Sequence, residues 1–300
     1  MEEVRHLPVL LPEVLEVLDC RPGRLYADGT VGGGGHSWGI LEKSFPTGRV
    51  IGLDWDEEAL ERARKNLSPF AGRFELRRAN YKDFKSVLES LSIPGVDGIL
   101  LDLGISSEQL ESRERGFSFR WDAPLDMRMS QETMTTAQEL VRKLPATELE
   151  SLLREFGEER WARRIARNIV RRRQKAPLRT TRELVEVIER SVPPQRRGIH
   201  PATRTFQALR ISVNEELNNL KAFLAHAPEL LNPGGRLCII SYHSLEDRIV
   251  KNYFREWARG EGRKNPPFCL LTSKPVVPSE EEISRNPRAR SAKMRAIEKL

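Results

Sequence analysis

The chain has 300 residues, of which 31% are charged and 39% hydrophobic, and its formal net charge is +7. No run approaches the roughly 18 uncharged apolar residues of a membrane-spanning helix, and the acidic start is unlike a basic secretory signal, so we expect a cytoplasmic protein without membrane contact. The basic balance favours an anionic partner, because a positive surface attracts phosphates and releases their counterions.

Short apolar runs alternate with amphipathic stretches over the first hundred residues, which is typical of βα units around a parallel sheet. The predicted strands are 24–28, 49–54, 73–79 and 96–102. A helix is predicted over 57–67, where Leu60, Ala63 and Leu67 share one face, and Asn80 is expected to cap the next. We therefore predict an α/β, Rossmann-like fold with a mostly parallel sheet.

The sharpest local signal is the string DGTVGGGGH at residues 28–36, between the first strand and the first helix. Glycines allow a positive φ and let the backbone lie directly against a ligand. A plain flexible turn is the alternative, but Asp54 ends the next strand about twenty residues later, where a carboxylate can bind ribose hydroxyls.

The spacing of the glycines narrows the choice of nucleoside cofactor. The dinucleotide pattern G-x-G-x-x-G fails, because its last position falls on Ser37 or Trp38, and no Walker-type G-x-x-x-x-G-K-[ST] is present. S-adenosylmethionine has a ribose and a sulfonium but no phosphate to cradle. Together with Asp102, which ends the fourth strand, the pattern favours S-adenosylmethionine.

After Asp102 the sequence becomes helical and strongly charged. Capping boxes are predicted at Thr147 with Glu150 and at Thr180 with Glu183, and a further helix over 158–174. We therefore predict three segments: 1–106 as the first part of the sheet domain, 107–204 as an inserted helical domain that recognises the substrate, and 205–300 as the second part.

The βα rhythm then returns. We predict a helix over 203–226, a turn over 232–235 and a strand over 236–241. A helix capped by Ser244 with Asp247 should extend to about Trp257, and residues 260–300 should hold two last strands.

Nine basic residues and no acidic ones lie between Arg160 and Arg179. On one helix they would contact phosphates without selecting a base sequence, although a solvated helix face is the alternative. The candidates for RNA contact are Arg164, Arg167, Arg171 and Arg172. Earlier aromatic residues could stack on an extruded base or pack between domains: Phe117, Phe119 and Trp121.

Several longer strings are more specific than the glycine turn. They are HLPVLL (6–11), DGTVGGGGHS (28–37), GILLDLGISS (98–107), RGFSF (115–119), PLDMRM (124–129), HPATRTFQALR (200–210), SYHSLEDR (241–248) and NPRARSAK (286–293). Over nearly the whole chain they resemble the bacterial 16S ribosomal RNA cytosine-N4 methyltransferases. The resemblance implies a class I methyltransferase fold with a helical insertion, S-adenosylmethionine as cofactor, and a target cytosine near the P site of the small ribosomal subunit.

The same resemblance implies roles for individual residues. The methionine end of the cofactor would contact Gly34, Gly35 and His36, and Asp54 would hold the ribose. Residues near the adenine and the sulfonium would be Tyr81, with Phe84 as its alternative, Asp102 and Gln109.

Methylation of the cytosine N4 amine requires hydrogen-bond acceptors, because its lone pair is delocalised into the ring, and a base for the departing proton. We expect Asp102 and Ser106 to accept hydrogen bonds from N4, and His243 is a further candidate. Turn formation by Ser106 and helix entry by His243 are the structural alternatives. Methylation at C5 would need a thiolate, yet no cysteine comes directly after the fourth strand, and Cys238 lies inside a predicted strand where it should be buried.

Cysteine and histidine usage argues against disulfides and metal binding. Cys20, Cys238 and Cys269 are odd in number and widely spaced, and the five histidines form no spaced ligand cluster, so we expect no metal.

Two other functions stay open, a small-molecule methyltransferase and a non-catalytic assembly factor that binds ribosomal RNA. The oligomeric state is also open, with a homodimer as one alternative.

Overall fold

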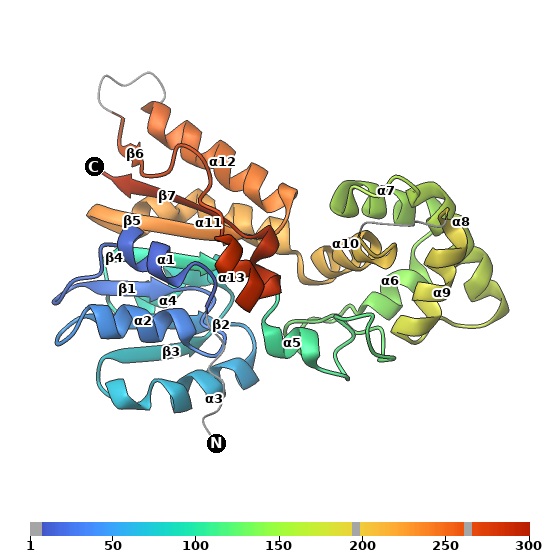
Figure 1. Ribbon diagram of the computed structural model, residues 1–300, viewed down its shortest axis with the longest axis horizontal. Coiled ribbons are helices and arrows are strands. Elements are labelled where there is room, and N and C mark those ends of the chain that lie inside the picture. Colours follow the sequence, from blue (N-terminus) through green and yellow to red (C-terminus); the bar gives the residue numbers. More distant parts are fainter. Residues whose placement is uncertain (1–7, 194–198, 261–265) are drawn as a thin grey trace. The chain divides into compact units, whose positions relative to one another are not determined.

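The chain divides into a unit built on one seven-stranded sheet and a unit built of helices (Figure 1). The computed structural model describes residues 8–193, 199–260 and 266–300. The sheet unit combines the chain up to Gly104 with Leu217–Leu300, and the helical unit is Ile105–Glu216. The first two residues of the string HLPVLL lie outside the described residues.

The sheet is mostly parallel. Its order is β3 (Phe74–Arg78), β2 (Arg49–Asp54), β1 (Leu25–Asp28), β4 (Val96–Asp102), β5 (Leu231–Ser241), β7 (Lys293–Lys299) and β6 (Phe268–Leu270). The strands from β1 to β5 pair in parallel, and β7 is antiparallel to both of its neighbours. This confirms the predicted Rossmann-like α/β fold, including the two last strands.

Helices cover both faces of the sheet, which is why the inner parallel strands β2 and β4 carry long buried apolar runs. One core contains side chains of α1 (Leu11–Val17), α2 (Gly35–Lys43) and α3 (Glu57–Asn66), and the other contains side chains of α4 (Phe84–Ser90), α11 (Glu216–Leu230) and α12 (Ser244–Arg259). Successive side chains of a strand point to opposite faces, so in β4 Leu100 joins the first core and Leu101 the second. Shorter elements of this unit are η1 (Ser68–Phe70), η2 (Tyr81–Asp83), α13 (Glu280–Arg285) and η4 (Pro287–Ser291).

Two helix predictions in the last third of the chain were wrong. The helix predicted over 203–226 is two helices, because Glu215 adopts the left-handed conformation with φ 52° between them. The predicted N-cap Ser244 is already helical: His243 is the N-cap, and its side chain accepts a hydrogen bond from the backbone N–H of Glu246. The predicted turn over 232–235 is confirmed within the bounds of β5: Val96 pairs with Leu231 but Gly98 with Arg236, so these four residues leave the strand pairing, and Gly234 has φ 73°.

The second unit is helical. Its helices are α5 (Ser107–Glu111), α6 (Ala137–Lys143), α7 (Ala146–Gly157), α8 (Ala162–Lys175), α9 (Thr181–Ser191) and α10 (Ala202–Asn214). They share one apolar core, to which Leu149, Ile165 and Leu209 contribute fully buried side chains. The unit thus runs past residue 204, where the sequence placed its end, to the break at Glu215.

The predicted caps of the helical unit had mixed outcomes. The box of Thr180 with Glu183 is confirmed at the start of α9. The box at Thr147 was wrong, because α7 begins at Ala146 after Pro145, without a side-chain cap. The helix predicted from residue 158 begins only at Ala162, since Glu158 is left-handed and ends α7.

Gly116 fixes a tight turn in the helical unit. Its φ is +69°, and a Cβ atom there would lie 2.1 Å from the backbone oxygen of Pro124. We expect Gly116→Ala to lower the free energy of unfolding by about 2–4 kcal/mol, through backbone strain plus the clash. Gly23→Ala is the matched control, because Gly23 has φ +75° but a Cβ atom there would meet no other atom within 4 Å. Chemical denaturation of both variants measures the difference, and equal losses would refute the steric part.

Among the described residues, the structure contains no helix that is long and apolar enough to cross a membrane.

Candidate functional site

The carboxyl ends of β1, β2 and β4 meet at one edge of the sheet. Strand β1 lies between β2 and β4, so the strand order reverses beside it, and ligands of open α/β sheets bind at such a switch point. Each of the three strands ends in a carboxylate: Asp28, Asp54 and Asp102.

The glycine turn follows β1 and is fixed by Asp28. This carboxylate is 1% exposed and accepts hydrogen bonds from the Ser37 hydroxyl at 2.7 Å and the Thr30 N–H at 3.1 Å. Burial raises the pKa of Asp28 above its usual value. Gly34, with φ 87°, is the N-cap of α2, so the turn requires a residue without Cβ there.

Asp54 is held to the glycine turn. One carboxylate oxygen accepts the Gly32 N–H at 2.8 Å and the other accepts the Asp56 N–H at 2.9 Å. Burial raises the pKa of Asp54 to about 6, and backbone hydrogen bonds from Asp56, Gly32 and Trp55 oppose the shift. An ionised carboxylate offers about four acceptor positions, so the group keeps acceptor capacity for a ligand.

The pKa of Asp54 predicts how ligand affinity depends on pH. If the ionised carboxylate binds ribose hydroxyls, the dissociation constant of S-adenosylmethionine should rise about tenfold per pH unit below pH 6 and be constant above pH 7. Calorimetric titrations from pH 5 to 8 check this. A flat profile in wild-type protein, or the same slope in Asp54→Ala, would assign the effect to another group.

Asp102 is organised by groups from three other segments. Its Oδ1 accepts the Tyr242 hydroxyl at 2.8 Å, its backbone N–H donates to Thr30 Oγ1 at 2.6 Å, and its Oδ2 lies 3.7 Å from His36 Nδ1. Burial and the Asp102 charge raise the pKa of Tyr242 well above its usual value. The hydroxyl therefore stays protonated and continues to donate.

His36 lies beside Asp102 and belongs to α2. Its side chain is 7% exposed, and Nε2 donates to the Val9 carbonyl at 2.9 Å. Burial lowers the pKa of His36, so the ring is neutral at pH 7. Neighbouring Gly35 faces Pro8, since a Cβ atom there would lie 3.1 Å from the Pro8 side chain.

The structure distinguishes between the two aromatic candidates after β3. Phe84 is fully buried in the core beside α11 and cannot reach a ligand. Both residues lie beside Gly29 in the glycine turn, but Tyr81 is only partly buried and packs edge-on against Phe223. Tyr81 is therefore the better candidate of the two.

Three other predicted site residues are used in helix caps. Ser106 and Gln109 belong to the helical unit and form a reciprocal capping box at the start of α5, with both hydrogen bonds at 3.1 Å. The His243 side chain is 6% exposed and caps α12. In this structure Ser106 and His243 therefore serve at helix starts, in line with the structural alternatives of turn formation and helix entry.

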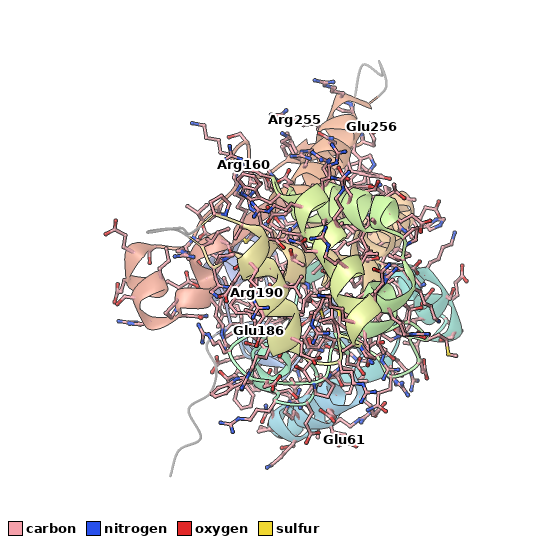
Figure 2. All side chains as sticks on the ribbon, turned by 90° about the vertical axis from the view of Figure 1, so that its right-hand side faces the viewer. Glu61, Arg160, Glu186, Arg190, Arg255 and Glu256 are labelled. Atoms are coloured by element: carbon pink, nitrogen blue, oxygen red, sulfur yellow. The ribbon has the colours of Figure 1, made fainter. Side chains whose placement is uncertain are left out.

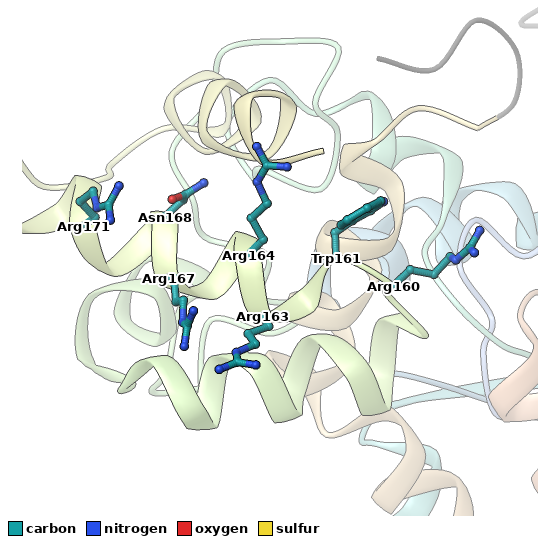
Figure 3. A pocket seen from close by; sticks show the side chains of 7 residues that line it. All are labelled: Arg160, Trp161, Arg163, Arg164, Arg167, Asn168 and Arg171. Atoms are coloured by element: carbon teal, nitrogen blue, oxygen red, sulfur yellow. The ribbon is translucent and has the colours of Figure 1, made fainter. Parts of the chain in front are cut away.

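The arginines predicted to bind RNA do not all lie together. Arg164, Arg167 and Arg171 line a hollow of about 440 Å³ along α8 (Figure 3). Arg172 is instead directed to α9: it donates to the Ala176 carbonyl at 2.7 Å and lies 3.8 Å from Glu183. All four arginines lie on α8, as predicted, but Arg172 is not among the residues that line the hollow.

The aromatic residues near the start of the helical unit are occupied by packing. Phe117 is 6% exposed and belongs to the core, and Phe119 stacks on His200 with ring centroids 4.5 Å apart. Trp121 is 40% exposed, but the Arg113 guanidinium lies over its ring at 4.3 Å. Phe117 and Phe119 thus pack within the helical unit, and these contacts do not test the predicted packing between domains.

Sequence reasoning gave no role to Asp28, Thr30 or Tyr242, although all three lie within the strings that carry the family resemblance. Asp28 and Thr30 build the turn, and Tyr242 orients Asp102. The signal that could have identified Tyr242 is its position directly after β5, since β5 is the neighbour of β4.

The carboxylates at this edge of the sheet suit S-adenosylmethionine as a ligand. Three carboxylates at one edge would repel a phosphate-bearing ligand, whereas S-adenosylmethionine offers ribose hydroxyls, a sulfonium cation and no phosphate. Asp54 has acceptor capacity for the ribose, because an ionised carboxylate offers about four acceptor positions and the backbone N–H groups of Gly32, Asp56 and Trp55 take three of them. The residues present therefore fit this group.

Comparisons with known proteins all find similarity to methylases or methyltransferases. A family model described as the MraW methylase family matches residues 3–300. The chain is similar to ribosomal RNA small subunit methyltransferase H of Heliobacterium modesticaldum, with 52% identity over 98% of each chain, and to that of Geobacter sulfurreducens, with 51% identity over 98% of this chain and 99% of the relative. The crystal structure of an rRNA methylase from Streptococcus thermophilus has a TM-score of 0.44 at 12% identity, covering 97% of this chain and 93% of that one, which is too distant to bear on function.

Proposed function

This chain belongs to the MraW methylase family, and we propose that it methylates the exocyclic N4 of a cytosine in the decoding region of 16S ribosomal RNA. At the coarser level it is a methyltransferase that uses S-adenosylmethionine and acts on ribosomal RNA, the substrate that its relatives' names state for them. A ribosomal RNA substrate, whether free or within the small subunit, implies a cytoplasmic enzyme.

One observation carries the proposal: the glycine turn ties Asp54 and Asp102 to the same edge of the sheet. Gly32 donates to Asp54, and Thr30, two residues earlier, accepts from the backbone of Asp102. A single nucleoside ligand can therefore contact both strand ends. This supports one cofactor site rather than two unrelated carboxylates.

The residues around the turn divide the cofactor between them in this proposal. Asp54 holds the ribose hydroxyls, and Tyr81 lies against the adenine. Gly34, Gly35 and His36 form the wall at the methionine end, where the small glycines leave room. When bound, the cofactor supplies an electrophilic methyl group on a sulfonium.

Asp102 is the catalytic residue in this proposal. Its carboxylate accepts a hydrogen bond from the N4 amine, which draws the lone pair out of the ring and toward the methyl carbon. After the N–C bond forms, the carboxylate takes the proton that N4 loses. Ser106 and His243 contribute indirectly as positioning residues, since each caps a helix that follows a strand end.

Tyr242 positions Asp102, and this predicts a partial loss in Tyr242→Phe. Removing the hydroxyl deletes one hydrogen bond to a charged group, at 2.8 Å, which is worth about 1.5–3 kcal/mol. We expect turnover to fall about tenfold or more, with the affinity for S-adenosylmethionine nearly unchanged. Single-turnover methyl transfer and calorimetry measure the two quantities. A loss confined to cofactor affinity would contradict the assignment.

RNA binding is assigned to α8 of the helical unit. Arg164, Arg167 and Arg171 would contact phosphates, which positions the RNA without selecting its sequence. Because Arg172 is directed to Glu183, it supports α9 in this proposal and does not touch RNA.

Mass spectrometry of ribosomal RNA nucleosides from cells with and without the protein tests the function. We expect loss of one N4-methylated cytidine, restored by the wild-type chain and not by Asp102→Asn. An unchanged nucleoside profile would overturn the proposal. Transfer to a small metabolite alone would favour a small-molecule methyltransferase, and failure to bind S-adenosylmethionine would favour an assembly factor.

A further inference from the structure

The outer face of α8 carries a concentration of positive charge that the rest of the described chain does not neutralise. At about 100° per residue, Arg163, Arg164, Arg167 and Arg171 fall on the face opposite Ala162, Ile165, Ala166 and Ile169, which are buried in the core. Arg160 precedes the helix on the same side, and α8 contains no acidic residue. These five arginines are called the α8 arginines below.

None of the α8 arginines has an ion pair or hydrogen bond to any part of the chain that the structure describes. Exposed arginines on neighbouring helices differ: Arg142 pairs with Glu139, Arg154 with Glu150, and Arg190 with Glu186, the last pair labelled in Figure 2. Like charges four residues apart on a helix destabilise it. The neighbouring helices α6, α7 and α9 pair these charges, whereas α8 leaves five of them together without a partner, so the α8 face is suited to an external anion.

The arginines also enclose space. Together with Trp161 and Asn168 they line the hollow of about 440 Å³. In Figure 3, Arg164 and Asn168 project from one side of α8, while Arg163 and Arg167 project from the other. The hollow therefore offers guanidinium groups along its length rather than at one point.

Trp161 adds an aromatic surface at one end. It is the N-cap of α8 and is 39% exposed, although a Trp side chain is usually largely buried. Its backbone N–H donates to Glu159 Oε1 at 2.8 Å, and this acid is 6% exposed and is not among the residues that line the hollow. A partly exposed indole beside unpaired arginines is suited to stacking on a planar ring.

We propose that the α8 arginines and Trp161 form a binding site for single-stranded RNA, in which Trp161 stacks on an unpaired base and the arginines hold the phosphates on either side of it. The inference rests on the proposed function and names the form of RNA that the helical unit takes. Stacking needs a base whose face is free, which a duplex does not offer. A purely acidic peptide would use the arginines and leave Trp161 without a role.

The first test addresses stacking with the full chain and a short single-stranded oligoribonucleotide. We expect Trp161→Ala to weaken binding at least about fivefold, and Trp161→Phe, which keeps a ring, to stay within about twofold of wild type. RNA should quench tryptophan fluorescence in wild type, and that part of the quench should be absent in Trp161→Phe. Equal affinity of wild type and Trp161→Ala would overturn the stacking role.

The second test addresses the phosphates. For single strands the slope of log affinity against log salt falls by about 0.7 for each phosphate that the protein no longer neutralises, so Arg164→Ala with Arg171→Ala should reduce the slope by about 1.4. Arg142→Ala is the matched control, because it removes an arginine of α6 that is already paired with Glu139. A slope unchanged in the double variant, or reduced as much per residue in the control, would overturn the role of the arginines in holding phosphates.

Competition identifies the ligand class. A labelled single strand is bound to the protein, and unlabelled competitors are added. The unlabelled single strand should displace it much better than the corresponding duplex or poly-glutamate. Equal competition by the duplex would mean that no base is stacked, and equal competition by poly-glutamate would mean an acidic-peptide site, so either result refutes the proposal. In all variants the affinity for S-adenosylmethionine should be unchanged. Failure of the proposed function is distinguishable, since then wild-type protein itself would transfer no methyl group to ribosomal RNA.

Discussion

Replacing Asp102 with Asn should lower single-turnover methyl transfer to ribosomal RNA at least about 100-fold, the usual effect of losing a general base. The Asn side chain has the same shape, and its oxygen can still accept the Tyr242 hydroxyl. Its amide then occupies the position of Oδ2, where it can only donate. The variant can therefore neither accept a hydrogen bond from the N4 amine nor take its proton.

The matched control is the same substitution at the other end of the same strand. Asp97 in β4 accepts the Leu25 N–H at 2.9 Å and the Asn232 side chain at 3.1 Å, away from the carboxyl edge. Asp97→Asn should lose some stability but transfer methyl groups at a rate within about threefold of wild type, because it touches no reacting group. Near wild-type turnover in Asp102→Asn would remove Asp102 from the mechanism.

Sequence periodicity predicted the strands well where burial on both faces leaves little freedom. Strands β2 and β4 have the predicted bounds because every residue from Val50 to Leu53 and from Gly98 to Leu101 is buried, which demands a continuous small or apolar run. The prediction of helix boundaries failed where a residue adopts an unusual backbone conformation. Glu215 is left-handed without being glycine, so nothing in the sequence marks the break between α10 and α11.

The candidate site was predictable to the extent that strand ends converge. The positions of Asp54 and Asp102 follow from topology alone, whereas the contact that orients Asp102 depends on the direction of one side chain, Tyr242. Arg171 and Arg172 show the same limit. They are adjacent in sequence, but about 100° apart on the helix, and only the tertiary position of Glu183 separates their roles.

The Asp54→Ala variant should lose affinity for S-adenosylmethionine while the stability of the free protein changes little. Asp54→Ala removes two ribose acceptors, and since hydrogen bonds to charged groups are worth about 1.5–3 kcal/mol each, the dissociation constant of S-adenosylmethionine should rise about 100-fold or more. At a cofactor concentration 100 times the wild-type constant, stabilisation by the ligand should fall from about 2.7 to about 0.4 kcal/mol. Thermal unfolding with and without cofactor measures this directly.

The stability of the free protein should change little in Asp54→Ala. The pKa of Asp54 is raised by burial to about 6 in the folded chain, so its contribution to folding is present below its ordinary pKa near 3.8 and is lost as the pH rises through 6. At pH 7 the ionised carboxylate therefore opposes folding, which offsets the loss of its bonds to Gly32 and Asp56.

Asp56→Ala should show the reverse pattern. Asp56 is the N-cap of α3 and accepts the Glu58 N–H at 3.2 Å, so its loss should lower the free energy of unfolding by about 1 kcal/mol while its backbone N–H still donates to Asp54. Cofactor affinity should stay within about threefold of wild type. If Asp54→Ala kept its ligand stabilisation, or if Asp56→Ala lost as much affinity, the carboxylate that ends β2 would not be the ribose acceptor.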